Sequence, residues 1–272
     1  MKKYSFLMSV YIKEKPEYLK LSIESMLNQT AKPDEIIIVK DGPLIKELNE
    51  VIDSYKEKNK NLFTVISLEK NIGTGLALNE GLKKARNELV ARMDSDDICK
   101  PNRCEKQLKE FEKDKELSIC GCNIDEFKGD ISNITGQRVV PEKNEDIYNF
   151  GKRRSPFNHP TVIYKKSKVL ENNGYSDLRR NQDIDLFGRM IFAGCKAYNI
   201  QESLLWFRAN DNLAKRRKSW ENTKSYIKTI KKFWKSGYSS FTDYAVVLLG
   251  QMCVFIIPSR FQLIVYKKIL RK

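Results

Sequence analysis

Apolar and polar positions follow two different periods along residues 1–122 of the chain. Strand patterns lie at residues 4–12, 35–40, 62–68, 88–93 and 117–122, and the run at 35–40 is continuous and β-branched, as is typical of a strand buried on both faces. Apolar residues recur every three or four positions, as on one face of a helix, at residues 16–27, 44–58, 75–85 and 101–111. Strands and helices that alternate in this way predict an α/β fold with a doubly wound, mostly parallel sheet.

The second half of the chain has a looser pattern. We expect a loop-rich stretch from residue 123 to about residue 155, a short helix ending at Asn172 and a helix at 183–194. Apolar runs predict further strands at 161–165, 196–200 and 203–208. From Ser219 onward the pattern is helical. The chain therefore divides into three regions, at residues 1–122, 123–217 and 218–272.

The composition is that of a globular protein. Apolar residues make up 41% of the 272 positions and charged residues 31%, which excludes a disordered chain. The six cysteines form no regular framework, so we expect reduced thiols in the core of a cytoplasmic protein. The single histidine, His159, excludes a metal site built from several histidines.

Positive charge is concentrated near the C-terminal end. Residues 208–272 hold 15 Lys and Arg against 3 Asp and Glu, so they carry 12 of the 15 net positive charges. Aromatic residues are interleaved with these basic positions, at Trp220, Tyr226, Phe233, Trp234 and Tyr238. Basic and aromatic residues mixed in this way are one signature of nucleic-acid binding, which is the alternative to an enzymatic function.

The same extension contains an apolar run at residues 245–257, which is too short to span a bilayer. Beside so many basic residues, the run suits a helix that lies on an anionic membrane surface. A helix packed on the protein core would have the same pattern, and the sequence leaves both interpretations open.

Acidic residues follow two of the predicted strands. In "ELVARMDSDDICKP", an apolar run stops at Asp94, Asp96 and Asp97, and Asp41 follows the run at 35–40. The carboxyl ends of parallel strands meet at one edge of a sheet, so we expect these acids to line one crevice. Carboxylates this close repel each other unless a cation joins them, and oxygen ligands suit Mg²⁺ or Mn²⁺.

Turn and helix-cap chemistry is a simpler explanation of the acids. An acidic loop before a proline often forms a turn, and Asp97 or Asn102 could cap a helix that starts at Pro101.

Two other kinds of nucleotide site are excluded by the sequence. It contains neither the glycine fingerprint of dinucleotide-binding folds nor a phosphate loop of the GxxxxGK[ST] type.

Six sequence blocks in consecutive order resemble a known family over residues 1–217. "FLMSVYIKEKPEYLKLSIESMLNQTAKPDEIIIVKDGP", "NIGTGLALNEGLKKA" and "ARMDSDDICKPNR" resemble the nucleotide-sugar half of family-2 inverting glycosyltransferases, which have the GT-A fold. "SPFNHPTVIYKKSKVLENNGY", "NQDIDLFGRMIFAG" and "LLWFR" resemble the acceptor half of bacterial transferases that build capsule, exopolysaccharide and O-antigen.

The resemblance implies a metal-dependent inverting glycosyltransferase of the hexosyltransferase class. It would move a sugar from a nucleotide-diphosphate donor, a UDP-sugar, to a polyprenyl-diphosphate-linked saccharide. Residues 1–122 would bind the donor, and residues 123–217 would bind the acceptor and hold the catalytic base. With the basic helical tail at 218–272 on anionic lipid, the protein would be cytoplasmic and peripheral at the inner face of the cell membrane, with no nucleic-acid partner.

The resemblance also assigns roles on the donor side. Asp41 corresponds to the acid that binds the uracil, and Tyr11 lies where the family lines the nucleotide pocket. Asp94 corresponds to the first acid of the DxD motif, facing the ribose and the metal. Asp96 corresponds to the acid that binds Mn²⁺ or Mg²⁺, and Asp97 to an acid beside the donor sugar.

On the acceptor side, Asp183 corresponds to the catalytic base, although an aspartate at the start of a helix is also an ordinary N-cap. The family's usual Glu before this base is Gln182 here, whose amide can still orient an acceptor hydroxyl. His159 lies in an acceptor-side block, and a packed core histidine is the alternative. Two other family positions differ. Leu78 lies where an Arg is common, and the place of a metal-binding His is taken by "WFRANDN", which offers Arg208, Asn210 and Asp211 instead.

Overall fold

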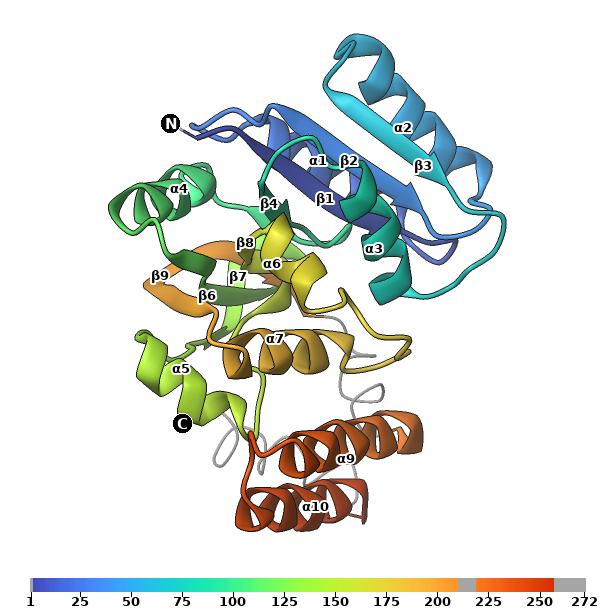
Figure 1. Ribbon diagram of the computed structural model, residues 1–272. Coiled ribbons are helices and arrows are strands. Elements are labelled where there is room, and N and C mark those ends of the chain that lie inside the picture. Colours follow the sequence, from blue (N-terminus) through green and yellow to red (C-terminus); the bar gives the residue numbers. More distant parts are fainter. Residues whose placement is uncertain (1, 210–218, 257–272) are drawn as a thin grey trace.

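One mixed sheet forms the centre of the molecule in the computed structural model, which describes residues 2–209 and 219–256 (Figure 1). The strands follow the order β3-β2-β1-β4-β8-β6-β9-β5, and β7 pairs with β6. Their bounds are β1 Tyr4–Val10, β2 Glu35–Lys40, β3 Phe63–Ser67, β4 Leu89–Arg92, β5 Ile98–Cys99, β6 Leu117–Lys128, β7 Asp130–Arg138, β8 Ile163–Lys165 and β9 Lys196–Arg208.

Strand direction confirms the predicted fold class. The first four strands are parallel to each other, and β8 runs antiparallel between β4 and β6. Strand β6 is antiparallel to β8 and parallel to β9. Strands β6 and β9 therefore point the same way as the first four strands. Only β5, β7 and β8 run in the opposite direction, so the described sheet is mixed and mostly parallel.

Helices cover both faces of this sheet because each strand buries alternate side chains on opposite faces. Phe6 of β1 packs in a core with α1, α2 and α4, whereas its neighbour Leu7 packs with α3, α6 and α7 on the other face. The helices are α1 Pro16–Leu27, α2 Lys46–Lys58, α3 Thr74–Lys84, α4 Arg103–Lys113, α5 Asn144–Gly151, α6 Lys166–Glu171, α7 Gln182–Phe192, α9 Trp220–Lys235 and α10 Phe241–Ile256, with a 3₁₀ turn at His159–Thr161.

The expected loop-rich stretch at 123–155 is wrong, because β6 continues to Lys128 and is followed by β7 and α5. Strand β7, with the sequence DISNITGQR, is mostly exposed, and within the described part of the chain it pairs with β6 alone. A strand with no buried face carries no alternation of apolar and polar residues, so its sequence looks like a loop.

The two strands expected at 196–200 and 203–208 are one strand, β9. Its register with β6 passes from Ile200 opposite Cys122 to Ser203 opposite Asn123. The polar residues Gln201 and Glu202 therefore lie in a bulge, which interrupts the apolar run without ending the strand.

The tail predicted to be helical from Ser219 forms α9 and α10 over its described residues. Within residues 2–209 and 219–256, no helix combines the length and the apolar character needed to cross a bilayer.

Candidate active site

The sequence-predicted donor residues follow three neighbouring strands. Tyr11 follows β1, Asp41 follows β2, and the acids at 94–97 follow β4, while β1 lies between the other two strands. The chain goes from β1 outward to β2 and β3, then returns to the other side of β1 with β4. Ligands of open α/β sheets bind at the carboxyl ends of strands at such a reversal. The fold thus brings these residues to one edge of the sheet.

Asp41 is buried, and the loop at 71–73 surrounds its carboxylate. The backbone N–H groups of Ile72 and Gly73 donate to it at 2.7 and 3.1 Å, and Nδ2 of Asn71 donates to it at 2.9 Å. Gly73 has a φ of +95°, which a residue with a side chain rarely adopts. A carboxylate has about four acceptor positions, so roughly one remains for a ligand.

Asp94, Asp96 and Asp97 form one acidic cluster, with a carboxylate oxygen of each within 4.8 Å of the others. Asp97 is fully buried, and its Oδ1 accepts a hydrogen bond from the Arg208 N–H at 2.9 Å. Its Oδ2 is buried without a hydrogen-bond partner among the described residues. Burial, then Asp96 and Asp94, raise the pKa of Asp97 well above its usual range. A hard divalent cation would satisfy both the unpaired oxygen and the repulsion, so the residues fit Mg²⁺ or Mn²⁺.

Two buried arginines, Arg92 and Arg208, hold this cluster. The sequence assigned no role to Arg92, and placed Arg208 only near the position of the family's metal-binding His. Arg92 Nη2 pairs with Asp94 Oδ1 at 2.5 Å. Arg208 donates from Nε to the Asp96 carbonyl at 2.8 Å, and its guanidinium lies 3.9 Å from the centre of the Tyr18 ring. Arginines inside apolar strand patterns were the available signal, because a buried charge needs a partner.

Asp183 and Gln182 lie at the start of α7, directly after Asn181, which has a left-handed φ of 59°. Burial is the main cause that raises the pKa of Asp183, and the Ile184 N–H and two arginines partly offset it. The Gln182 side chain lies against Gly75, where an added Cβ would come within 3.0 Å of it. The beginnings of α7 and α3 therefore meet, which places Asp183 on the same side of the sheet as the loop at 71–73 that surrounds Asp41.

His159 is half-buried in the 3₁₀ turn between α5 and β8. Its Nε2 lies 2.9 Å from the Tyr175 hydroxyl, and its ring packs against Phe187. Burial, and then the charge of Arg92, lower the pKa of His159 well below its usual range, so the ring is neutral. His159 therefore packs as a core histidine would. It also lies near Arg92, which pairs with Asp94 of the acidic cluster.

Besides Gln182, two positions depart from the family pattern, and the structure describes one of them fully. Leu78 is fully buried in the core, so it offers no contact to a donor. The exposed Arg179 instead reaches the loop at 71–73. Its Nη1 donates to Asn71 Oδ1 at 2.8 Å and lies against Gly73. No local sequence pattern links Arg179 to residues 71–73, so its place at the site could not be predicted from the sequence. Asn210 lies outside the described residues.

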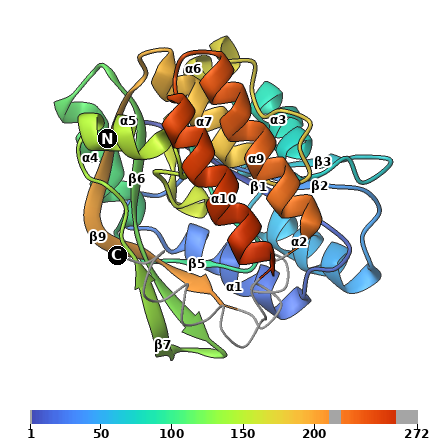
Figure 2. The same ribbon diagram turned by 90° about the horizontal axis from the view of Figure 1, so that it is seen from below.

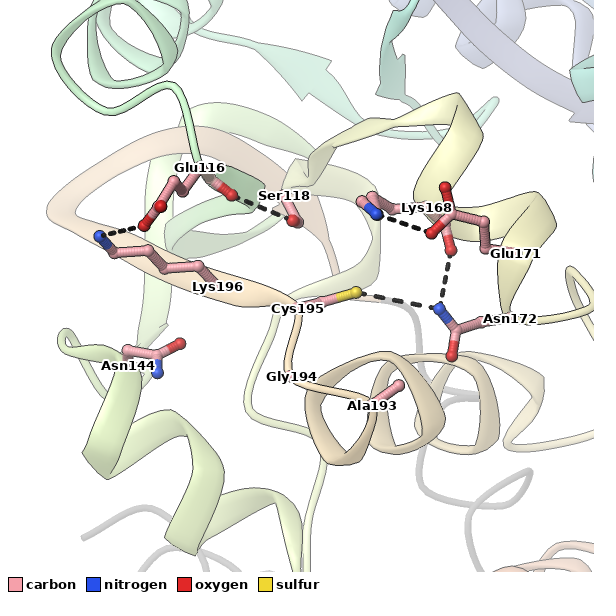
Figure 3. Close-up of a pocket in the computed structure, with 10 residues that line it drawn as sticks. All are labelled: Glu116, Ser118, Asn144, Lys168, Glu171, Asn172, Ala193, Gly194, Cys195 and Lys196. Carbon is pink, nitrogen blue, oxygen red and sulfur yellow. Dashed lines mark hydrogen bonds and ion pairs between the residues drawn. The ribbon is translucent and has the colours of Figure 1, made fainter.

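A separate pocket of about 680 Å³ lies at the amino ends of the parallel strands β6 and β9 (Figure 3). It is bounded by the beginnings of β6 and β9 and the ends of α6 and α7. Its lining therefore lies at the far end of the strands from the acidic cluster. The lining residues are Glu116, Ser118, Asn144, Lys168, Glu171, Asn172, Ala193, Gly194, Cys195 and Lys196.

The sequence matches the family described as Glycosyl transferase family 2 over residues 5–176. It is 36% identical over 271 residues to the Escherichia coli UDP-Gal:alpha-D-GlcNAc-diphosphoundecaprenol beta-1,3-galactosyltransferase, covering 99% of this chain and 97% of that protein. It is 36% identical over 224 residues to the amylovoran biosynthesis glycosyltransferase AmsE of Erwinia amylovora, covering 82% and 83% of the two chains.

Solved structures show the same fold at low identity. The structure of S. aureus TarS 1-349 in complex with UDP-GlcNAc has a TM-score of 0.67 and 17% identity, covering 98% of this chain and 76% of that one. The mannosyltransferase PcManGT of Pyrobaculum calidifontis, in complex with GDP-Man and Mn²⁺, has a TM-score of 0.66 and 13% identity, covering 96% and 72%.

Proposed function

Since this chain belongs to glycosyl transferase family 2, we propose that it is an inverting hexosyltransferase of surface polysaccharide biosynthesis. Its donor is a UDP-sugar, and its acceptor is a saccharide carried on a polyprenyl diphosphate. The observation that carries this proposal is the match along almost the whole length of the Escherichia coli galactosyltransferase, whose name specifies both a UDP donor and a diphosphoundecaprenol acceptor. The order of strands around the acidic cluster supports the same site.

Asp96, together with Asp94 and Asp97, would hold Mn²⁺ or Mg²⁺, as the unpaired buried oxygen of Asp97 indicates. When bound, a divalent cation neutralises negative charge on the nucleoside diphosphate leaving group. Arg92 and Arg208 hold residues 94–97 in place, Arg92 through the Asp94 carboxylate and Arg208 through the Asp96 carbonyl.

The remaining residues divide between donor and acceptor. Asp41 accepts the N3–H of uracil, and Tyr11 lines the nucleotide pocket. Asp183 takes the proton from the acceptor hydroxyl as that hydroxyl attacks the anomeric carbon. Displacement in one step inverts the configuration at that carbon. Gln182 and His159 orient the acceptor, and Asp97 lies beside the donor sugar.

A transfer assay with the full-length protein tests the function. We expect sugar transfer from a UDP-hexose to an N-acetylglucosaminyl diphosphate on a polyprenyl chain, loss of transfer in excess chelator, and recovery with Mn²⁺. Asp96→Ala should abolish metal-supported transfer without unfolding the protein, whereas Asp53→Ala, at an exposed acid of α2, should not. Full activity in chelator would contradict the metal, and no transfer from any UDP-hexose would contradict the function.

The structure bears on the alternative of nucleic-acid binding. Of the aromatic residues that suggested it, Phe233 and Tyr238 are buried, and Trp234 stacks on Tyr244 at 5.3 Å. Trp220 is 51% exposed, but it packs against Phe255. Base stacking needs free ring faces, which Phe233, Trp234 and Tyr238 do not offer, and we propose no nucleic-acid partner. We place the enzyme at the cytoplasmic face of the cell membrane as a peripheral protein, because its proposed acceptor is a membrane lipid.

A further inference from the structure

Helices α9 and α10 form an antiparallel hairpin on the outside of the molecule. Trp220, at the start of α9, contacts Phe255 near the end of α10, and Trp234, near the end of α9, contacts Phe241 at the start of α10. Seen from below, the two helices lie side by side as the layer nearest to the viewer (Figure 2). Helix α9 packs on α7, where the Phe233 ring lies against Gly188. One face of the hairpin is therefore buried and the other faces outward.

The outward face of α10 is apolar. Phe241, Leu249 and Ile256 are 62%, 66% and 71% exposed, and their spacing of eight and seven residues places them on one side of the helix. The one charged residue of α10, Asp243, lies on another side, where it pairs with Arg153 at 2.5 Å. Single exposed apolar residues are common on soluble proteins, but a stripe along a whole helix indicates a surface that something covers.

The outward face of α9 is basic. Lys224, Lys228, Lys231 and Lys235 are exposed and recur at intervals of four, three and four residues, so they form one stripe. None of them pairs with an acid within residues 2–209 and 219–256, whereas Lys232 pairs with Asp185 at 2.7 Å. The only acid of α9 is Glu221, in its first turn. A lysine stripe beside an apolar stripe is complementary to an anionic bilayer, with headgroups at the lysines and acyl chains at the apolar residues.

One end of the hairpin lies beside the acceptor side of the candidate site. Ser225 Oγ donates to the Arg180 carbonyl at 2.7 Å, and Asn181 Nδ2 donates to the Asn222 carbonyl at 3.2 Å. Residues 180 and 181 directly precede Gln182 and Asp183. Because Phe255 lies against Trp220, the end of α10 is at this place as well.

We propose that the outer face of the α9–α10 hairpin docks on an anionic lipid bilayer and thereby brings the acceptor side of the site to the headgroup layer. The docking itself does not depend on the catalytic role. Its purpose rests on the proposed function, because a saccharide on a polyprenyl diphosphate lies in that layer.

Vesicle co-sedimentation of the full chain tests the docking. Vesicles of phosphatidylcholine with phosphatidylglycerol should pellet the protein, and pure phosphatidylcholine vesicles should pellet much less of it. The double variants Leu249→Gln/Ile256→Gln and Lys228→Gln/Lys231→Gln should each weaken binding to the anionic vesicles by about tenfold or more. The matched controls Ile131→Gln/Ile134→Gln and Lys56→Gln/Lys58→Gln, at exposed positions of β7 and α2, should bind like the wild type.

Two results would overturn the docking surface. One is equal pelleting of the docking variants and the wild type. The other is a lower melting temperature or a smaller particle mass for Leu249→Gln/Ile256→Gln, because then the chain itself or a second copy covers the stripe. Since all four substituted positions are exposed, we expect melting temperature and mass to remain those of the wild type.

The purpose of docking is tested with two acceptors, a short-chain water-soluble diphosphate saccharide and the same saccharide on a polyprenyl chain in anionic vesicles. The docking variants should keep wild-type turnover on the soluble acceptor and lose transfer to the embedded one. Equal loss on both acceptors would contradict the docking role. A wild-type protein that binds vesicles but transfers sugar to neither acceptor would refute the proposed function and leave the docking intact.

Discussion

At the scale of single residues, hydrogen-bond partners distinguish the carboxylates at the site. Three donors from residues 71–73 surround the Asp41 carboxylate, so it is held rigidly and keeps about one acceptor position. Asp97 is fully buried but has one hydrogen-bond donor among the described residues, the Arg208 N–H. The difference supports the roles proposed for them, a neutral N–H group of the base at Asp41 and a cation at Asp97.

The first prediction concerns Asp183 as the base. Asp183→Asn should lower turnover by about 10²–10⁴-fold, the usual contribution of a general base, and leave donor affinity nearly unchanged. Steady-state kinetics together with calorimetry of UDP binding separate the two effects. If donor affinity fell while turnover stayed intact, Asp183 would be a binding residue.

The pH dependence of the same residue gives a second prediction. A base must be ionised to act, and burial raises the pKa of Asp183. Activity should therefore fall as the pH drops through this raised pKa, giving an acid limb above the ordinary aspartate value of about 3.9. The limb should be absent from the residual activity of Asp183→Asn. A limb that persists unchanged in this variant belongs to another group.

Asp41 leads to a third prediction, on nucleotide choice. Its carboxylate can accept the N3–H of uracil, but cytosine offers only an acceptor at N3, so two acceptors would face each other. UDP should bind more tightly than CDP by about tenfold, the equivalent of one hydrogen bond to a charged group. Calorimetry of both nucleotides with Mn²⁺ measures this ratio, and equal affinities would remove Asp41 from base recognition.

At the scale of elements, close contact between helices decides where the tail sits. Helix α9 approaches α7 at Gly188, where an added Cβ would come 2.1 Å from the Phe233 ring. Helix α10 reaches the core through Val247. The sequence left the apolar run at 245–257 open between core and lipid. Over the described residues of this run, Val247 faces inward, while Leu249 and Ile256 remain exposed.

This packing gives a fourth prediction. Gly188→Ala should lower the free energy of unfolding by about 1–3 kcal/mol, since the added methyl group overpacks the contact. Gly250→Ala, in α10, meets nothing within 4 Å. It should raise the free energy of unfolding by about 0.5–1 kcal/mol, because alanine favours the helix. Urea unfolding measures both, and equal effects of the two substitutions would contradict the α7–α9 contact.

At the scale of the whole molecule, one continuous sheet joins the donor-side and acceptor-side regions. The boundary expected at residue 122 falls inside β6, and β8 inserts between β4 and β6. Arg208, at the end of β9, bonds to the loop after β4. Residues more than a hundred positions apart therefore build the acidic cluster together.

The fifth prediction follows from this construction. UDP with Mn²⁺ should stabilise the full chain as one unit, by about 2.7 kcal/mol at a concentration one hundred times the dissociation constant. Differential scanning calorimetry should show a single transition that moves upward, and Asp96→Ala should lose most of the shift. Two separate transitions, of which only one responds, would mean that the two regions unfold independently.

Local sequence patterns were sufficient to predict the alternating elements of residues 1–122, except the short strand β5, and to place Asp41 and the acids at 94–97 at one edge of the sheet. Strand and helix periods are local, and parallel strands end at the same edge of their sheet. Packing in three dimensions was needed to place β8 beside β4, to join residues 196–208 into one strand, and to bring Arg92, Arg179 and Arg208 to the site. Pairing between distant segments leaves no period in the sequence, and a buried arginine is defined by a partner that the chain supplies from elsewhere.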